Sequence, residues 1–282
     1  MTWYRRMAHS STKIGIFHLF ALSLLAVVVA FTPTTAAPRP ELEAIAARQP
    51  ELLKRALGQL KAPSSQPQLY FVGFAGYGGQ SVFKREVLAV RQMFDDRFGT
   101  NGRSIALVNH PSTANDIPLA DASNLDAVLQ HLGKLMNPNR DTLFLFLSSH
   151  GIEGRLAVDM PGLALRSLTP HQVKSMLDRA GIRRRIIVIS SCHSGSFIPT
   201  LADPNTLVIA AARADRSSFG CEDKRRWTYF GDAYFNRALR QETSFRRAFE
   251  HARKLVALWE AQQQLVPSLP QMAGGESLSD AD

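Results

Sequence analysis

Short apolar segments alternate with amphipathic segments along most of the chain after residue 67. The apolar segments are rich in branched and aromatic side chains, which is typical of strands buried on both faces of a sheet. These segments are residues 69–74, 105–108, 143–147, 186–189 and 207–210. The alternation predicts a mostly parallel sheet with helices on its faces, which is an α/β fold.

The segments between and after the strands carry apolar residues at helical spacing. The helix expected after residue 168 has the clearest ends, because Thr169 suits the N-cap, Gln172 completes a capping box and Gly181 suits the C-terminal end. Two more helices, at about 229–240 and 245–261, follow the last strand. The apolar positions expected to pack in the core are Phe83, Val87, Val90, Phe94 and Phe98, then Leu125, Val128, Leu129, Leu132 and Met136, then Phe245, Phe249, Ala252, Val256 and Trp259.

Residues 1–36 are expected to direct export rather than to fold with the rest of the chain. Arg5, Arg6 and Lys13 form a basic flank, an apolar stretch follows over residues 14–31, and the small residues 34–36 resemble a cleavage site. This stretch fits either a cleaved signal peptide or an uncleaved membrane anchor. The expected location is periplasmic or secreted, with anchoring to the inner membrane if the segment is retained.

The remaining residues divide into three regions by composition. Residues 37–67 contain five prolines around a helical stretch at 41–60, which predicts a lead-in or linker. Residues 68–264 are expected to form one globular domain with a sizeable core. Residues 265–282 are rich in proline and glycine and are expected to be a flexible tail.

Charge and cysteine content exclude several classes of protein. The formal net charge is +9, and residues 1–36 carry three of the positive charges and no acids. The densest basic cluster, Arg183–Arg185, directly precedes an apolar strand, so we expect no nucleic-acid partner. Two cysteines are too few for a disulfide scaffold. No metal-ligand spacing or Walker-type loop is present, and the glycines of residues 73–79 do not match the dinucleotide-binding template.

Two strand ends carry the residues best suited to chemistry. The strand at 143–147 leads into Ser148-Ser149-His150-Gly151, and the strand at 186–189 leads into Ser190-Ser191-Cys192-His193-Ser194-Gly195. Ligands of open parallel sheets bind beyond the carboxyl ends of the strands. The sequence therefore predicts that His150 and Cys192 face one cleft.

This pair has the parts needed for nucleophilic catalysis. An imidazole can take the thiol proton and later return it to a leaving amine. The backbone N–H groups of Gly151 and Cys192 are candidates to stabilise a tetrahedral oxyanion. His193 is a poor base for Cys192, because neighbouring residues in such a segment point apart. The alternative interpretation is that His150 is a capped loop residue and that Cys192 is a small buried side chain.

These segments resemble the catalytic segments of legumain-like cysteine peptidases, which belong to the same clan as caspases. The resemblance includes residues 210–221 and 227–232, which are similar to the segments that shape the substrate pocket of that family, and it covers about residues 69–240. It implies a caspase-like three-layer sandwich and hydrolysis of peptide bonds in peptide or protein substrates through an acyl-enzyme. It implies no metal and no organic cofactor.

By the same resemblance, Cys192 matches the nucleophile, His150 the base and Gly151 the glycine of the oxyanion loop. Asp232 matches the pocket carboxylate. Three further candidates for substrate binding are Ser217, Ser218 and His193.

The chain departs from the family pattern in two places. His193 stands where legumains have a glutamate, and the asparagine and arginine of their first loop have no clear match between residues 76 and 83. Gln80 is expected either to orient His150 in place of that asparagine or to cap a turn. Lys84 and Arg85 are expected to be either a substrate-binding cation or solvated helix residues.

Other functions remain open from the sequence. One alternative is a catalytically silent relative that binds peptides or proteins in the same cleft. A serine hydrolase that uses Ser191 or Ser194 is disfavoured, because the chain lacks a nucleophile elbow. Cys221 is either a buried thiol or a disulfide partner that protects or silences the site.

Overall fold

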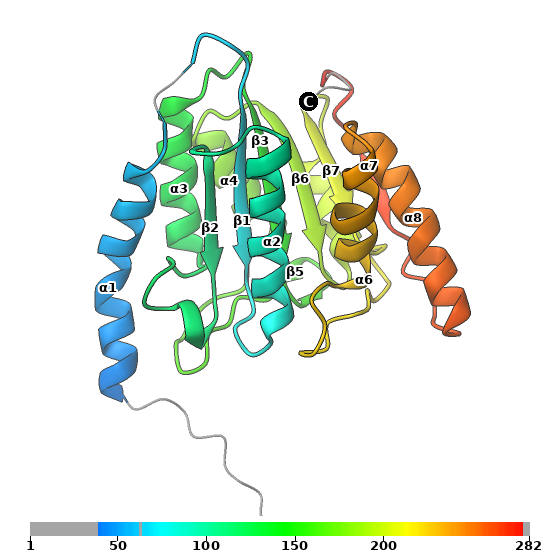
Figure 1. Ribbon diagram of the computed structural model, residues 1–282, viewed down its shortest axis with the longest axis horizontal. Helices are drawn as coiled ribbons and strands as arrows, with labels where there is room; N and C mark the ends of the chain where they lie inside the picture. Colours follow the sequence, from blue (N-terminus) through cyan, green and yellow to red (C-terminus); the bar gives the residue numbers. More distant parts are fainter. Residues whose placement is uncertain (1–38, 62–63, 279–282) are drawn as a thin grey trace, which may run out of the picture. The chain divides into compact units, whose positions relative to one another are not determined.

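The computed structural model describes residues 39–61 and 64–278, all of which belong to one compact unit. Its centre is a six-stranded sheet with the strand order β2-β1-β3-β6-β7-β8 (Figure 1). The strands are β1 (Leu69–Ala75), β2 (Ser104–Val108), β3 (Thr142–Ser148), β6 (Arg184–Ser190), β7 (Thr206–Ala210) and β8 (Gln271–Ala273). The first five pair in parallel and coincide with the strands predicted from the sequence, which confirms that prediction.

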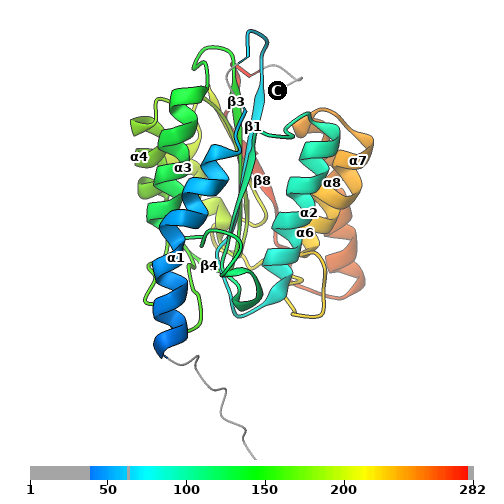
Figure 2. The ribbon, with the colours of Figure 1, turned by 60° about the vertical axis from the view of Figure 1, so that its left-hand side comes forward.

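Helices cover both faces of the sheet (Figure 2). One face carries α2 (Ser81–Arg97), a continuous helical segment made of α6 (Tyr229–Gly231), the π-helical η3 (Asp232–Ala238) and α7 (Leu239–Gln241), and then α8 (Phe245–Gln262). The other face carries α1 (Arg39–Gly58), α3 (Ala122–Leu135), α4 (Pro170–Arg179) and α5 (Ile198–Leu201). This arrangement confirms the predicted α/β fold of three layers and is consistent with a caspase-like sandwich.

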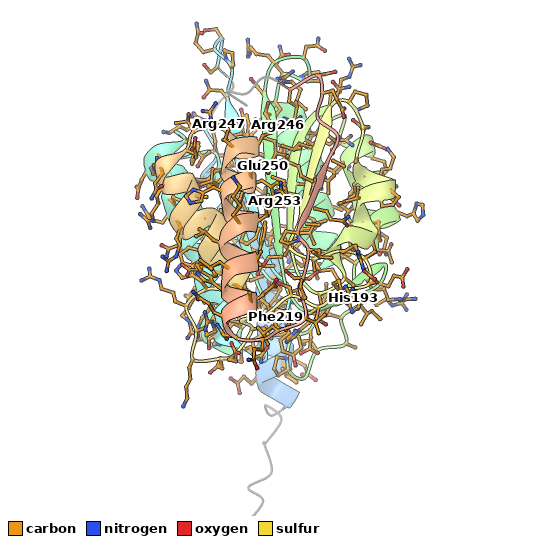
Figure 3. The ribbon with its side chains drawn as sticks, turned by 90° about the vertical axis from the view of Figure 1, so that its right-hand side faces the viewer. His193, Phe219, Arg246, Arg247, Glu250 and Arg253 are labelled. Atoms are coloured by element: carbon orange, nitrogen blue, oxygen red, sulfur yellow. The ribbon has the colours of Figure 1, made fainter. Side chains whose placement is uncertain are left out.

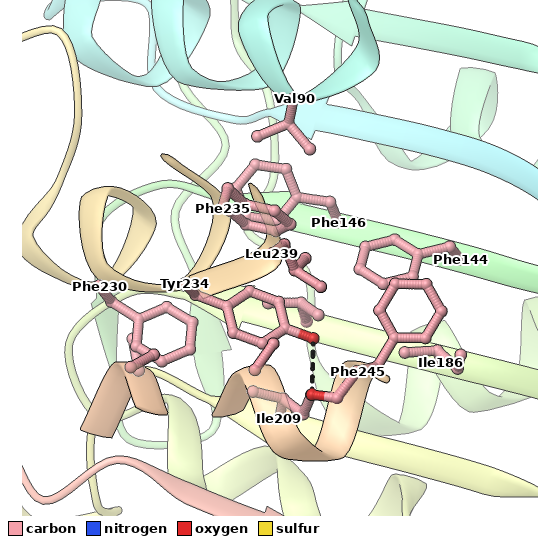
Figure 4. Close-up of a cluster of buried hydrophobic side chains, with 14 of the residues drawn as sticks. Val90, Phe144, Phe146, Ile186, Ile209, Phe230, Tyr234, Phe235, Leu239 and Phe245 are labelled. Carbon is pink, nitrogen blue, oxygen red and sulfur yellow. Dashed lines mark hydrogen bonds between the residues drawn. The ribbon is translucent and has the colours of Figure 1, made fainter. Parts of the chain in front are cut away.

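Each layer of helices encloses its own apolar core. On the face of α2 and α8, Phe235 lies 4.5 Å from Phe146 and Phe245 lies 5.0 Å from Phe144, measured between ring centroids (Figure 4). The hydroxyl of the buried Tyr234 donates a hydrogen bond of 3.3 Å to the Phe245 carbonyl oxygen. Full burial of such side chains contributes about 1.5–3 kcal/mol each, so this cluster anchors the helical layer to the sheet.

Helix α8 buries an apolar stripe against the sheet. Phe245, Phe249, Ala252 and Val256 are buried, whereas Arg247, Glu250 and Arg253 lie on the outer surface (Figure 3). Glu260 is the one charged residue of the helix that is buried, and it accepts a hydrogen bond from the Ser268 N–H. The predicted core role of this stripe is confirmed, except that Trp259 is only partly buried.

The capping predicted for α4 is confirmed. The Thr169 hydroxyl accepts a hydrogen bond from the Gln172 N–H, and the Gln172 side chain accepts one from the Thr169 N–H. Gly181 follows the helix with φ of +69°, a conformation that costs glycine little.

Helix α1 lies in the region predicted as a lead-in and packs against the domain. Ile45 and Leu52 are buried. The Gln49 side chain accepts a hydrogen bond of 2.8 Å from the Leu119 N–H and donates one to the Ala114 carbonyl. The helix therefore forms part of the folded unit.

The prediction of a flexible tail at residues 265–282 is wrong for the part that the structure describes. Strand β8 pairs antiparallel with β7, Ser268 is buried and Leu278 packs into the core. A three-residue strand is too short to give a periodic signal, which is why the sequence pattern missed it.

The predicted export segment, residues 1–36, lies outside the described residues. Within the described part of the chain, no helix has the length and apolar content needed to span a bilayer.

Candidate active site

The two predicted strand ends meet at the carboxyl edge of the sheet. Ser148 ends β3 and is paired in register with Ser190, which ends the neighbouring strand β6. The Ser149 N–H donates a hydrogen bond of 3.2 Å to the Ser190 carbonyl oxygen. The segments that follow the two strands are also in contact. Gly151 lies so close to Cys192 that a Cβ on it would be 2.6 Å from the Cys192 carbonyl oxygen. Only glycine allows this approach of the two segments.

Gln80 holds the imidazole of His150. The His150 Nε2 and Gln80 Oε1 atoms are 2.6 Å apart. An amide oxygen only accepts, so Nε2 carries the hydrogen and Nδ1 is the free basic nitrogen of the neutral ring. Gln80 occupies the N-cap position of α2, but its side chain makes no capping hydrogen bond. Of the two roles predicted for Gln80, the structure therefore favours orientation of His150.

Aromatic rings enclose the half-buried His150. The rings of Tyr77 and Phe83 meet the imidazole edge to face, with centroids 4.7 Å and 5.0 Å away. Burial lowers the pKa of His150 below its ordinary value of 6.5. The neutral form, which can accept a proton, is therefore favoured at neutral pH.

Cys192 lies in the turn after β6 and lines the same cavity as His150. Its Sγ accepts a hydrogen bond of 3.3 Å from the Ser218 N–H and lies 3.5 Å from the Ser218 carbonyl oxygen. An N–H donor stabilises negative charge on sulfur. No hydrogen bond joins Cys192 to His150, and no described residue accepts one from the Cys192 N–H.

The cavity between the two groups is small, at about 20 Å³. That is room for about one water molecule, so a substrate side chain needs the surrounding segment to open. The lining residues are Phe83, Ser149, His150, Ser190, Ser191, Cys192, Ser218, Phe219, Cys221 and Thr228.

His193 contacts the segment at 214–216 through its side chain and its backbone. It adopts the left-handed conformation with φ of +57°, and its Nδ1–H donates a hydrogen bond of 2.9 Å to the Ala214 carbonyl. Its backbone N–H donates to the Arg216 carbonyl. His193 thus fixes the segment at 214–216 beside the site, and its role in substrate binding stays a prediction.

The other predicted pocket residues are not all at the cavity. Ser218 contacts the Cys192 sulfur, but Ser217 is exposed and lines a neighbouring hollow. Asp232 accepts a hydrogen bond from the Asn236 side chain and lies 3.3 Å from the guanidinium of Arg237, on its own helix. Neither Ser217 nor Asp232 lines the cavity at Cys192, and their roles in substrate binding stay predictions.

The two basic residues near the start of α2 are held by other groups. The Lys84 ammonium lies 3.1 Å from His110 Nδ1 and donates to the Ser112 hydroxyl. The Arg85 guanidinium donates to the carbonyl oxygens of Asp223 and Arg225. Arg85 therefore fixes the segment at 222–226 to α2.

Glu86 is a buried carboxylate that the sequence analysis did not identify. It is fully buried on α2, and it accepts hydrogen bonds from the Ser148 hydroxyl at 2.6 Å, the Thr228 hydroxyl at 2.7 Å and the Thr228 N–H at 3.0 Å. Since the Thr228 proton points to Glu86, the Ser190 hydroxyl donates to Thr228 Oγ1 at 3.0 Å. Glu86 therefore connects α2 to the ends of both strands that carry His150 and Cys192.

The signal for Glu86 was present in the sequence. It is an acidic residue between Phe83 and Val87 on the face of α2 that packs on the sheet. A charged residue on an apolar helical face is rarely buried without partners.

Cys221 is a free, half-buried thiol that lines the same cavity as Cys192. Burial, together with the neighbouring Cys192 and Glu222, raises the pKa of the Cys221 thiol. Cys221 is therefore held as the neutral thiol at neutral pH.

The fold and the site define a class of protein: an α/β sandwich, consistent with the caspase-like one, with a histidine and a cysteine after the ends of adjacent parallel strands. The model of the peptidase C13 family matches residues 123–278, which is more than half of the chain. The chain belongs to this family, the legumain family of cysteine peptidases. A comparison with curated proteins finds no match.

Proposed function

We propose that this protein is an exported cysteine endopeptidase in which His150 is the general base and Cys192 the nucleophile. The observation that carries the proposal is the contact of the two strand ends, where Gly151 lies against the Cys192 carbonyl while Gln80 leaves His150 Nδ1 free. Membership in the peptidase C13 family supports peptide or protein substrates.

The proposed reaction begins with proton transfer from the Cys192 thiol to His150 Nδ1. The thiolate attacks the carbonyl carbon of the scissile bond, and the oxyanion that forms accepts hydrogen bonds from the N–H groups of Cys192 and Gly151. The imidazolium returns its proton to the leaving amine, and the acyl-enzyme remains. Water then attacks the thioester as His150 takes a proton from it, and the proton passes to the departing Cys192 sulfur.

Substrate binding requires a change at the cavity. Its volume of about 20 Å³ holds about one water molecule, whereas a substrate side chain takes the place of several. Phe219 and Cys221 line the cavity from the segment after Ser218. We propose that this segment moves outward when the substrate residue before the scissile bond enters.

Export is part of the proposal and is supported by the basic, apolar and small-residue pattern of residues 1–36. Compartment fractionation of cells that express the full chain tests it. Recovery in the periplasm or the medium is expected for a cleaved signal, and recovery in the inner membrane for a retained anchor. Recovery in the cytoplasm would contradict export.

The central experiment is a peptide-library cleavage profile of the reduced protein and of Cys192→Ala and His150→Ala. Each substitution is expected to lower kcat/KM by about 10³-fold or more, because each removes a group that acts in bond breaking. Cys221→Ser is the matched control, since it removes the other thiol of the same cavity. Iodoacetamide, but not a serine-directed phosphonate, is expected to inactivate the enzyme. Peptide binding without turnover by the reduced wild type would favour a silent binding module instead.

A further inference from the structure

A basic groove lies on the helical face of α2, away from the cavity at Cys192. Its main hollow has a volume of about 550 Å³, which is in the range of sites that hold ligands. A second hollow of about 320 Å³ adjoins it and shares Asn236 and Arg240. The main hollow is lined by Ala89, Gln92, Met93, Asp96, Arg97, Arg226, Trp227, Asn236 and Arg240.

Positive charge in the main hollow is not neutralised by the lining residues. The Arg97 guanidinium donates to the Leu239 carbonyl, and Arg240 donates to the Asn236 side chain, so both meet neutral acceptors. Arg226 is exposed, and no described residue forms a hydrogen bond or ion pair with its side chain. Asp96 is the one carboxylate of the lining, against three guanidinium groups. The groove therefore favours an anionic occupant.

The groove also offers apolar surface between its charges. Met93 is buried beneath it and Trp227 is half-buried at its side. The segment that carries Trp227 is held in place, because Arg85 binds the Asp223 and Arg225 carbonyls and Glu86 binds Thr228. A preformed surface of this kind costs less ordering on binding.

We propose that this groove is a substrate exosite that binds an acidic segment containing an apolar or aromatic residue. A concave surface with an apolar floor fits a peptide side chain flanked by carboxylates, whereas a flat membrane surface does not enter it. Arginine pairs with carboxylates in two-point contacts, which suits this choice of ligand.

The position of the groove fixes how a substrate reaches both sites. The groove residues on α2 are 8 to 16 positions after Ser81, which is next to Gln80 at His150. At about 1.5 Å per helical residue this is roughly 12–24 Å. An extended peptide covers that distance with about four to seven residues. The exosite thus selects substrates with an acidic segment about that far from the bond that is cut.

Binding is tested without relying on catalysis. A fluorescein-labelled peptide with four acidic residues around one phenylalanine is titrated into full-length Cys192→Ala protein, and anisotropy is measured. Arg226→Ala/Arg240→Ala is expected to weaken binding by about tenfold or more, since two carboxylate contacts are lost. The control Arg179→Ala/Arg183→Ala removes the same charge from the opposite face and is expected to leave Kd within about twofold. Equal weakening by both double variants, or no binding by the parent, would overturn the exosite.

The second arm rests on the proposed peptidase function. Three substrates share one cleavable sequence. One is short, and the other two also carry the acidic segment five residues away, on the N-terminal side in one and on the C-terminal side in the other. The exosite predicts a lower KM for one of the extended substrates, lost in Arg226→Ala/Arg240→Ala while the short substrate is cut at the parent rate. Equal KM values for short and extended substrates would refute the exosite. Absence of any cleavage would refute the proposed peptidase and leave the binding result to decide the exosite.

Discussion

Glu86→Gln tests whether the buried carboxylate on α2 supports the ends of β3 and β6. Burial raises the pKa of the Glu86 carboxyl above its ordinary value of 4.5, against the opposing effect of the hydrogen bonds from Ser148 and Thr228. The folded protein therefore holds this proton more tightly than the unfolded chain does. The stability that the group contributes is fully present below about pH 4.5 and is lost as pH rises through the raised folded-state pKa.

The magnitude follows from this linkage. Between about pH 4.5 and the raised folded-state pKa of Glu86, each pH unit lowers the unfolding free energy of the wild type by about 1.4 kcal/mol relative to a variant that cannot ionise. Glutamine keeps an oxygen for Thr228 and presents its amide to the Ser148 hydroxyl, which can rotate to accept. Glu86→Ala instead leaves three buried donors without an acceptor, and we expect it to cost about 3–6 kcal/mol.

The assay is urea denaturation of wild type, Glu86→Gln and Glu86→Ala at pH values from 4 to 8. The stability of wild type minus that of Glu86→Gln is expected to fall as pH rises from about 4.5. Glu250→Gln, on the outer surface of α8, is the control for replacing a carboxylate by an amide outside the sheet interface. If the stability of wild type minus that of Glu86→Gln is constant or grows with pH, the inference that burial raises the pKa of Glu86 is wrong.

Three further changes probe the site and its support. Gln80→Ala is expected to lower kcat by about 10-fold or more with little change in KM, because His150 loses the partner that fixes its tautomer. Recovery of kcat by Gln80→Asn would support this role, and wild-type kinetics of Gln80→Ala would contradict it. Mild oxidation of the wild type is expected to abolish activity and to lower the mass by two hydrogens, because Cys192 and Cys221 form a disulfide. Cys221→Ser should keep its activity under the same oxidation, and equal loss of activity in both proteins would show that the two thiols do not pair. Leu52→Ala is expected to destabilise the domain by about 2–4 kcal/mol in urea denaturation, and an unchanged midpoint would show that α1 is dispensable.

The sheet was predictable because its signals are local. A strand buried on both faces reads as an apolar run whatever its neighbours are, and the Thr169 capping box is written within four residues. The proximity of His150 and Cys192 followed from one rule, that the carboxyl ends of adjacent parallel strands share an edge. Strand β8 was not predicted, because it is defined by its pairing with β7 and not by a pattern in its own three residues.

The polar support of the site could not be predicted in the same way. Glu86 is 62 residues from Ser148 and 142 residues from Thr228, and their hydrogen bonds exist only once β3, β6 and α2 have assembled in register. The hydrogen bond from the Ser218 N–H to the Cys192 sulfur involves a backbone group, which any residue except proline could supply at position 218. The residue type at position 218 therefore does not reveal this contact.

Helix α2 contributes residues to both the candidate active site and the basic groove. Its first residues hold Gln80 at His150, its middle carries Glu86 between the two strand ends, and its last turns line the basic groove. Arg85 adds the segment at 222–226 to the same helix. A peptide that binds across the groove therefore contacts α2 and the segment that carries Trp227, and both also contribute residues to the cavity at Cys192. The two hollows share no lining residue, so the exosite experiment can separate them: KM for the extended substrate reports on the groove, and the cleavage rate of the short substrate reports on the candidate active site.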